Sequence, residues 1–320
     1  MTPPRRPLRM GRIIPGSFAH VIRQFMASPA FTGKADSTRY SWGRALFLAE
    51  EEGGLGGCSV QVVRPAIIQG FLDGLAEYPG KQQVAKTALK ALEKYAVVRD
   101  LVPMPFMTGT SVVGSNGGHE PWPDACVALA EQHARPDLAR AVTLALNTGQ
   151  RGSDTVRMSP TDIEEKLCPT TGIWRSGINV IQQKTGRRLW VPFIYSEFEA
   201  TLASWERRPG PFYLRPDGLP YTRPALSTAW NRERDSNEAL KPLAGLVLHG
   251  LRATAVVRAR KRGLSDLQIS NVFGMSEAMV ARYSRLADQG EMAMAAVHFL
   301  DRTGGEQVTG NIQNVTGLKN

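Results

Sequence analysis

Cysteine is scarce in this sequence, which limits the chemistry that the chain can perform. Three cysteines occur among 320 residues, Cys58, Cys126 and Cys168. Their number is odd, and none stands at CxxC or Cys/His spacing for a metal. The sequence therefore argues against a disulfide framework and a cysteine-based metal site. We expect all three to be packing residues of a protein in a reducing cytoplasm, with no metal and no cofactor.

Long apolar runs are also lacking, so the sequence predicts no membrane-spanning helix and no membrane partner. The first residues, "MTPPRRPLRMGRIIPG", contain Arg and Pro but no apolar core of a secretory signal. We expect residues 1–15 to form a disordered basic leader. The alternative is a basic arm that touches phosphates.

Acidic residues are fewer than basic ones. The chain has 29 Asp and Glu against 39 Lys and Arg, a formal net charge of +10. A surplus of this size favours a polyanionic partner, either nucleic acid or an acidic membrane surface. Basic globular proteins without such a role exist, so charge alone does not decide the function.

The composition changes at residues 103–123, which are rich in Gly, Pro and Ser and have no periodic apolar pattern. Such a segment is typical of a linker. It divides the sequence into a helical domain at 16–102 and a second domain at 124–302. A polar tail follows at 303–320.

The first domain shows helical apolar spacing in several segments. We predict one helix that begins at a cap of Asp36 or Ser37 and another that is ended by Pro79–Gly80. The third helix, 81–102, has an apolar stripe formed by Val84, Ala88, Leu92, Tyr95 and Val98.

Lysines of this third helix lie mostly off the apolar stripe. Lys81, Lys86 and Lys90 are the main candidates for contact with DNA. A solvated face is the more common explanation of such a row. The alternative is a face laid against DNA phosphates.

The second domain combines helices with one hairpin. A helix ends at Gly149, and residues 177–193 alternate around a Thr-Gly turn, which indicates a β-hairpin. Further helices are predicted at 197–208, 223–240, from 247 onward, at 265–273, at 276–289, and at the chain end over 291–300, which includes the apolar strip 292–300. The predicted fold class is mainly α with a small β-sheet or hairpin.

Five residues with chemical potential recur at element junctions of the second domain: Arg151, Lys184, His249, Arg252 and Tyr283. Two arginines and a lysine suit a phosphate with dispersed charge. Fixed guanidinium groups stabilise the additional charge of a pentavalent transition state. A tyrosine hydroxyl is a competent nucleophile in such a site, and a lysine can protonate the leaving oxygen.

The segments "TGQRGSD", "QQKTGRR", "HGLR" and "MVARYSR" resemble, in this order, the tyrosine recombinase (phage integrase) family. The resemblance covers about residues 120–290 and implies a helical core-binding domain followed by an α+β catalytic domain. It implies that Tyr283 attacks a DNA phosphodiester and forms a 3′-phosphotyrosyl link. Arg151 and Arg252 would hold the phosphate, His249 would assist proton transfer, and Lys184 would protonate the leaving 5′-oxygen.

The resemblance also assigns supporting residues and has one exception. Asp154 matches the family's supporting acidic residue, and Arg187 and Arg282 lie beside the motifs as DNA-binding candidates. The family usually has His or Trp, in a "GH" pair, before the tyrosine. Here Gly274 and Met275 occupy that region, so either Met275 substitutes by packing or one hydrogen bond to the phosphate is lost.

These features predict a site-specific DNA recombinase that integrates or excises a mobile element without metal or ATP. The partners would be double-stranded DNA, three further copies of the chain in a homotetramer, and an accessory bending or directionality factor, at the cytoplasmic nucleoid. The alternatives are a type IB topoisomerase, a catalytically weakened architectural DNA-binding factor, and a basic enzyme unrelated to nucleic acid.

Overall fold

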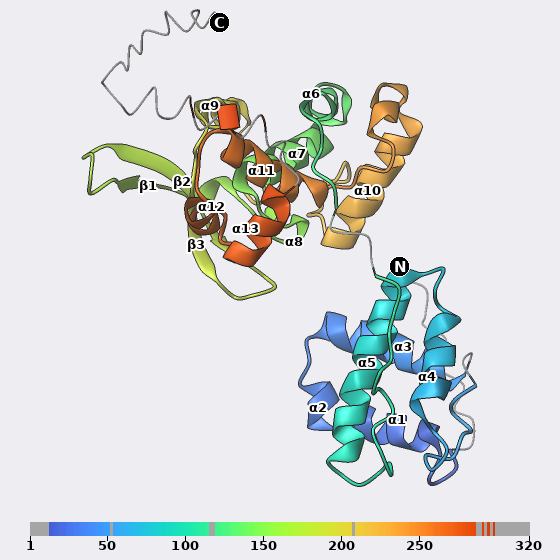
Figure 1. Cartoon of the computed structure of the whole chain (residues 1–320). Helices are drawn as coiled ribbons and strands as arrows, with labels where there is room; N and C mark the ends of the chain where they lie inside the picture. The colour runs from blue at the N-terminus through green and yellow to red at the C-terminus, as the bar shows by residue number, and fades with distance from the viewer. Residues whose placement is uncertain are drawn as a thin grey trace, which may run out of the picture. The chain divides into compact units, whose positions relative to one another are not determined.

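The computed structural model describes residues 13–51, 54–114, 119–206 and 209–285, together with single positions at 290, 293, 294 and 297. The chain divides into two compact units, Met1–Gly117 and Gly118–Asn320 (Figure 1). Each unit has its own apolar core.

The first unit is helical throughout its described part. Its helices are α1 (Phe18–Ala27), α2 (Pro29–Thr32), α3 (Asp36–Glu50), α4 (Pro65–Asp73) and α5 (Pro79–Val97). Proline opens three of them, as its fixed φ and missing N–H favour the first helical turn. The α5 helix packs against α1, α3 and α4 (Figure 1).

The core of the first unit lies along α5. Leu89 and Leu92 are fully buried there, together with Phe18 and Phe25 of α1. Phe106, from the segment expected to be a linker, meets Phe18 edge to face with ring centroids 5.5 Å apart. The start of that segment therefore belongs to the core of the first unit.

The structure corrects several details of the predicted helices. Asp36 is the first residue of α3 and Ala35 caps it, so neither predicted cap residue occupies that position. Gly74 caps α4, and Pro79 opens α5 because proline fits a first turn better than a last one.

The predicted apolar stripe of α5 is only partly buried. Ala88 and Leu92 are buried, whereas Val98 lies beyond the helix end and is 74% exposed. Ala85 and Leu89 belong to the buried face that the pattern missed.

The second unit contains a small sheet among helices. Its elements are α6 (Asp124–His133), α7 (Pro136–Thr148), α8 (Gly152–Thr155), η1 (Pro160–Asp162), β1 (Ile163–Leu167), β2 (Trp174–Ile181), β3 (Arg188–Pro192), α9 (Ser196–Ser204), α10 (Arg223–Ser236), η2 (Glu238–Leu243), α11 (Gly250–Lys261), α12 (Asp266–Phe273) and α13 (Glu277–Ser284). The predicted fold class, mainly α with a small sheet, is confirmed.

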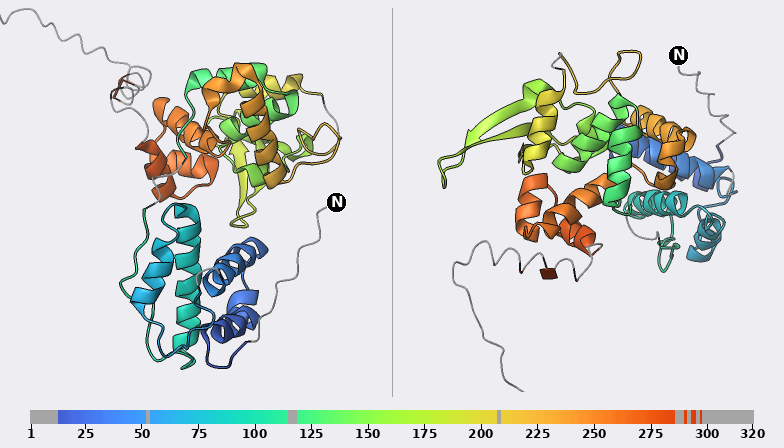
Figure 2. Two further views of the ribbon diagram at one scale, coloured as in Figure 1. Left: turned by 90° about the vertical axis from the view of Figure 1, so that its right-hand side faces the viewer. Right: turned by 90° about the horizontal axis from the view of Figure 1, so that it is seen from above.

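The sheet is antiparallel with the order β1-β2-β3. Ile178 pairs with Ile163 on one side and with Val191 on the other, which sets the register. The predicted hairpin is β2–β3. The β1 strand was not predicted, because its sequence IEEKL is mostly exposed and has no apolar alternation. Figure 2 shows the β1–β2 end of the sheet extending away from the helices of this unit.

Two apolar clusters stabilise the second unit. The larger contains Trp122 and Trp230, whose ring centroids lie 5.1 Å apart, together with α7. The smaller joins α11, α12 and α13 and includes Phe273. Trp122 comes from the expected linker, and its backbone nitrogen donates to Thr254 Oγ1 at 2.7 Å, so the end of that segment belongs to the second core.

Helix boundaries in this unit also differ from the predictions. The α11 helix begins at Gly250 and not at 247, and α10 ends at Ser236 before the short η2 helix. None of the helices in the described part of the chain is long and apolar enough to cross a membrane. Residues 1–12 of the expected basic leader 1–15, the tail at 303–320 and most of the C-terminal strip at 292–300 lie outside the described residues.

The end of α7 generates a stability prediction. Gly149 caps this helix with φ +61°, and an added Cβ would lie 2.7 Å from Cγ of buried Phe273. We expect Gly149→Ala to lower the free energy of unfolding by about 3 kcal/mol, from backbone strain plus a core clash. Gly172→Ala is the control, since its φ is +67° but nothing lies within 4 Å of the added atom. It should cost about 1 kcal/mol. Equal losses in urea unfolding would contradict the clash.

Candidate active site

The predicted site residues come from four segments of the second unit. Arg151 precedes α8, Lys184 lies in the β2–β3 turn, His249 caps α11, whose first turn carries Arg252, and Tyr283 lies in α13. Contacts of α11 with α7 and α13 bring these segments to the same region of the unit.

Arg252 is the most buried cation among the five. Its side chain lies on α11 with only 3% of the residue exposed, and its Nη1 donates to the carbonyl oxygen of Gly149. That carbonyl is free because α7 ends at Gly149. Burial, and next the positive charge of Arg151, lower the pKa of Arg252 to about 10, while the charges of Tyr283 and Asp154 oppose this change. Arg252 therefore stays charged at neutral pH, close to a second guanidinium.

Arg151 has unused hydrogen-bonding capacity in this buried region. Among the described residues, its Nη1 is a buried donor with no hydrogen-bond partner. A buried donor without a partner costs free energy unless a ligand satisfies it. Two guanidinium groups in proximity, one with an open donor, form a site that favours an anion.

Asp154 connects the α8 turn to the hairpin. It is 3% exposed, and its Oδ1 accepts a hydrogen bond from the backbone nitrogen of Gln183 at 2.9 Å. Its Oδ2 is buried without a hydrogen-bond partner among the described residues. The Asp154 carboxylate interacts electrostatically with Arg252. It also anchors the backbone of Gln183, which directly precedes Lys184.

His249 is neutral at physiological pH. Its ring packs edge to face on His119 with centroids 5.2 Å apart. Burial is the main cause that lowers the pKa of His249 to about 4. Neighbouring positive charges add to this effect, and they belong to His119, Arg252, Arg223 and Arg151. A neutral imidazole can accept a proton or donate one hydrogen bond to an anion.

Tyr283 and Met275 share the apolar cluster of α11, α12 and α13. They are 4% and 3% exposed. Ser270 Oγ donates to the backbone oxygen of Met275 at 2.7 Å, which fixes the turn before α13. Met275 therefore packs in the core at the position where the resemblance expects His or Trp.

Gly274 has a backbone reason to be glycine. It caps α12 with φ +61°, and an added Cβ would lie 2.2 Å from Leu189 Cδ1 of β3. The end of α12 thus packs closely on the hairpin.

Lys184 is exposed at the tip of the β2–β3 turn and makes no hydrogen bond or ion pair with the described residues. The structure places its backbone beside the group of Arg151, Arg252 and Asp154 through the bond between Asp154 and Gln183. Arg187, at the end of the same turn, is exposed as well.

The remaining DNA-binding candidates lie on exposed surfaces. Lys81 and Lys90 are exposed on α5, Lys86 is half-buried there, and Arg282 is exposed on α13. Lys81 Nζ lies 4.1 Å from the centroid of the Tyr78 ring.

Four residues near the site were not predicted from the sequence: His119, Gln150, Gln182 and Arg223. Gln182 continues the inward alternation of Ile178 and Val180, so the period of β2 could have indicated a buried amide. His119 stands in a glycine-rich segment, and nothing in its neighbours indicates a contact with His249.

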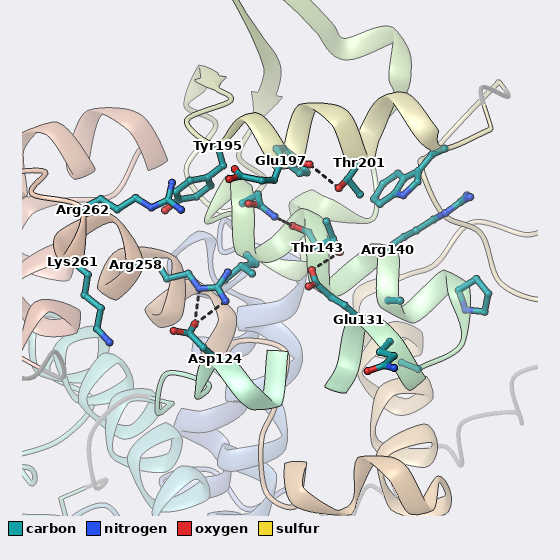
Figure 3. Close-up of a pocket in the computed structure, with 18 residues that line it drawn as sticks. Asp124, Glu131, Arg140, Thr143, Tyr195, Glu197, Thr201, Arg258, Lys261 and Arg262 are labelled. Atoms are coloured by element: carbon teal, nitrogen blue, oxygen red, sulfur yellow. Dashed lines mark hydrogen bonds and ion pairs between the residues drawn. The ribbon is translucent and has the colours of Figure 1, made fainter. Parts of the chain in front are cut away.

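A cavity of about 920 Å³ lies between α6, α7, α9 and α11 and contains none of the predicted site residues (Figure 3). Its polar groups largely satisfy each other. Arg258 pairs with Asp124 at 2.7 Å, Thr143 donates to Glu131 at 2.8 Å, and the Arg262 guanidinium lies 4.1 Å from the Tyr195 ring centroid. In the described residues no group of His, Cys, Asp and Glu is arranged to hold a metal ion.

No protein-family model and no curated protein matches the sequence. Solved structures do match. A lambda integrase tetramer bound to a Holliday junction matches with a TM-score of 0.67 and 18% identity, over 84% of this chain and 76% of that one. Lambda integrase bound to DNA matches with a TM-score of 0.64 and 17% identity, over 90% and 99%. The Tn1549 transposon integrase with a circular intermediate DNA matches with a TM-score of 0.64 and 13% identity, over 89% and 99%.

At these identities the likeness shows a shared fold. The chain therefore has the fold of lambda integrase, as the resemblance of its motifs predicted.

The low pKa of His249 has a consequence for stability. In the unfolded chain the imidazole takes up a proton near pH 6.5, whereas in the folded protein it does so near pH 4. Between these values the unfolded state binds more protons, so the free energy of unfolding falls as the pH is lowered. We expect His249→Gln to remove about 1 kcal/mol of this fall between pH 6.5 and 4.5, because the ring is partly solvent-screened.

Urea unfolding over this pH range measures the effect. His133→Gln, at an exposed position of α6, controls for the loss of an imidazole. Parallel pH profiles of wild type and His249→Gln would contradict a neutral, partly desolvated His249.

Proposed function

We propose that this protein is a site-specific DNA recombinase that cleaves and rejoins DNA through a phosphotyrosyl intermediate. The observation that carries the proposal is the pair Arg151 and Arg252 next to Tyr283, with an open Nη1 donor on Arg151. A phosphodiester would satisfy that donor and the unbalanced positive charge together. Lambda integrase and the Tn1549 integrase, which share the fold, are seen with DNA.

In the proposed reaction the Tyr283 oxygen attacks phosphorus, a P–O bond to tyrosine forms, and the bond from phosphorus to the 5′-oxygen breaks. The tyrosine proton passes to the neutral imidazole of His249, which keeps it or passes a proton on to water. Lys184 donates a proton to the leaving 5′-oxygen. Arg151 and Arg252 stabilise the additional charge on the non-bridging oxygens. Rejoining reverses these steps, so the phosphotyrosyl bond conserves the energy of the broken bond.

Assembly and location belong to the same proposal. The chain would act as a homotetramer on two duplexes, with an accessory bending or directionality factor, in the cytoplasm at the nucleoid. The first unit would bind the DNA backbone through Lys81, Lys86 and Lys90 on α5, and Arg187 and Arg282 would bind it from the second unit. A lambda integrase tetramer on a Holliday junction supports this arrangement by analogy of fold.

Covalent trapping tests the function. We expect nicked suicide duplexes that carry the DNA flanking the protein's own gene to give a detergent-resistant protein–DNA band without added metal. Tyr283→Phe should abolish the band and keep duplex binding, because only the nucleophilic oxygen is removed. We expect the rate of DNA cleavage to fall more than about 1,000-fold, because phenylalanine has no nucleophilic oxygen.

The control is the binding of the same duplex, measured by fluorescence anisotropy. Tight binding without any covalent band in the wild type would contradict the proposal and favour an architectural DNA-binding factor. Relaxation of supercoiled plasmid without a paired site would favour a topoisomerase.

A further inference from the structure

Two glutamine side chains are buried at the junction of the hairpin, the α7–α8 turn and the end of α12. Gln150 and Gln182 are each 1% exposed. Gln182 Nε2 donates to Gln150 Oε1 at 2.9 Å, and Gln150 Nε2 donates to the carbonyl of Phe273 at 2.9 Å. The amides therefore form a chain that crosses from β2 to α12.

The remaining polar atoms of Gln182 are also engaged. Its Nε2 lies 3.2 Å from the carbonyl oxygen of Gly274, and its Oε1 accepts from Thr185 Oγ1 at 3.0 Å. Its backbone nitrogen donates to the carbonyl of Arg187 at 2.9 Å. A buried amide is costly unless its hydrogen bonds are made, and here they are made in one geometry only. An apolar side chain could fill the same space but could not fix that geometry.

These bonds hold the turn on both sides of Lys184. The β-ladder ends at the pair Ile181 and Arg188, and beyond it backbone bonds between Gln182 and residues 185–187 close the turn. Side-chain bonds add further anchors to the tip. Gln182 holds Thr185, and Asp154 holds the backbone of Gln183. Lys184 is thus an exposed side chain on a backbone that is anchored at three neighbouring residues.

The same two amides also connect to the segments that carry Arg151 and Tyr283. Gln150 directly precedes Arg151, and its carbonyl partner Phe273 precedes Gly274 and Met275, which lead into the helix of Tyr283. One hydrogen-bonded pair therefore links the positions of the lysine, one arginine and the tyrosine helix.

We propose that Gln182, bonded to Gln150, is a positioning residue for Lys184 as the proton donor to the leaving 5′-oxygen. This inference rests on the proposed function. Loss of the Gln182 amide removes the anchor of Thr185 and loosens the tip of the turn, and Lys184 then spends less time within reach of the oxygen that it protonates. The bond from Gln150 Nε2 to the Phe273 carbonyl is kept, so binding of DNA and attack by Tyr283 do not depend on the Gln182 amide.

A substrate with sulfur in place of the bridging 5′-oxygen tests the inference. Its cleavage forms the P–O bond to Tyr283 and breaks a P–S bond, and the thiolate leaves without a proton because a thiol is far more acidic than an alcohol. We expect Gln182→Met to slow single-turnover cleavage of the oxygen substrate about 100-fold. On the sulfur substrate it should cleave at the wild-type rate. Lys184→Ala should show the same pattern.

Thr185→Val is the second variant and should give the same pattern, in case Gln182→Met folds poorly, because it removes the hydroxyl that donates to Gln182 Oε1. Gln183→Met is the matched control, because its side chain is exposed and its bond to Asp154 uses the backbone nitrogen. It should keep the rate on both substrates. An equal loss on both substrates in Gln182→Met, or no loss on either, would overturn the positioning role.

Hydrogen–deuterium exchange gives a readout that needs no activity. We expect the amides of residues 183–187 to exchange faster in Gln182→Met than in Gln183→Met, beyond any change in the core helices of the second unit. Unchanged exchange at residues 183–187 would overturn the positioning role of Gln182 and leave the proposed function standing. A wild-type protein that cleaves neither substrate overturns the proposed function, and the inference with it.

Discussion

The burial of the Arg252 guanidinium is the constraint on which the rest of the second unit depends. A charge that is taken out of water costs several kcal/mol unless hydrogen bonds and opposite charges offset the loss. Here the offset comes from the Gly149 carbonyl and from the nearby carboxylate of Asp154. Arg151 acts in the opposite direction, because it brings a second positive charge with an open donor. Two guanidinium groups near one carboxylate leave an excess of positive charge, which favours an anion and is the physical basis of the proposed phosphate chemistry.

The ends of two helices provide the frame for this site. Both α7 and α12 end in a glycine with left-handed backbone, and each leaves carbonyl oxygens without a partner inside the helix. Arg252 takes the carbonyl of Gly149, and the two buried glutamines take those of Phe273 and Gly274. The carbonyls at a helix C-terminus carry partial negative charge, so they suit cationic and amide donors. The same bonds that complete the helices therefore position the arginine and the hairpin.

Local patterns predicted much of this architecture. The end of α7 at Gly149 and the β2–β3 hairpin follow from a glycine and a Thr-Gly turn, whose backbone requirements are local. The β1 strand could not be predicted, because its exposed charged residues are held by pairing with β2 and not by their own pattern. The segment at 103–123 was expected to be a linker for its composition, yet Phe106 and Trp122 pack in two different cores. The contact of His119 with His249 joins residues far apart in the sequence, so no local pattern encodes it.

The most direct test of this account is to identify the residue that becomes bonded to DNA. A trapped complex would be digested with nuclease and protease, and the peptide that carries the remaining nucleotide would be sequenced by tandem mass spectrometry. The account predicts a phosphotyrosyl adduct on Tyr283, in the peptide that contains α13. An adduct on another tyrosine or on a serine would contradict it, because the two arginines would then not surround the reacting phosphate.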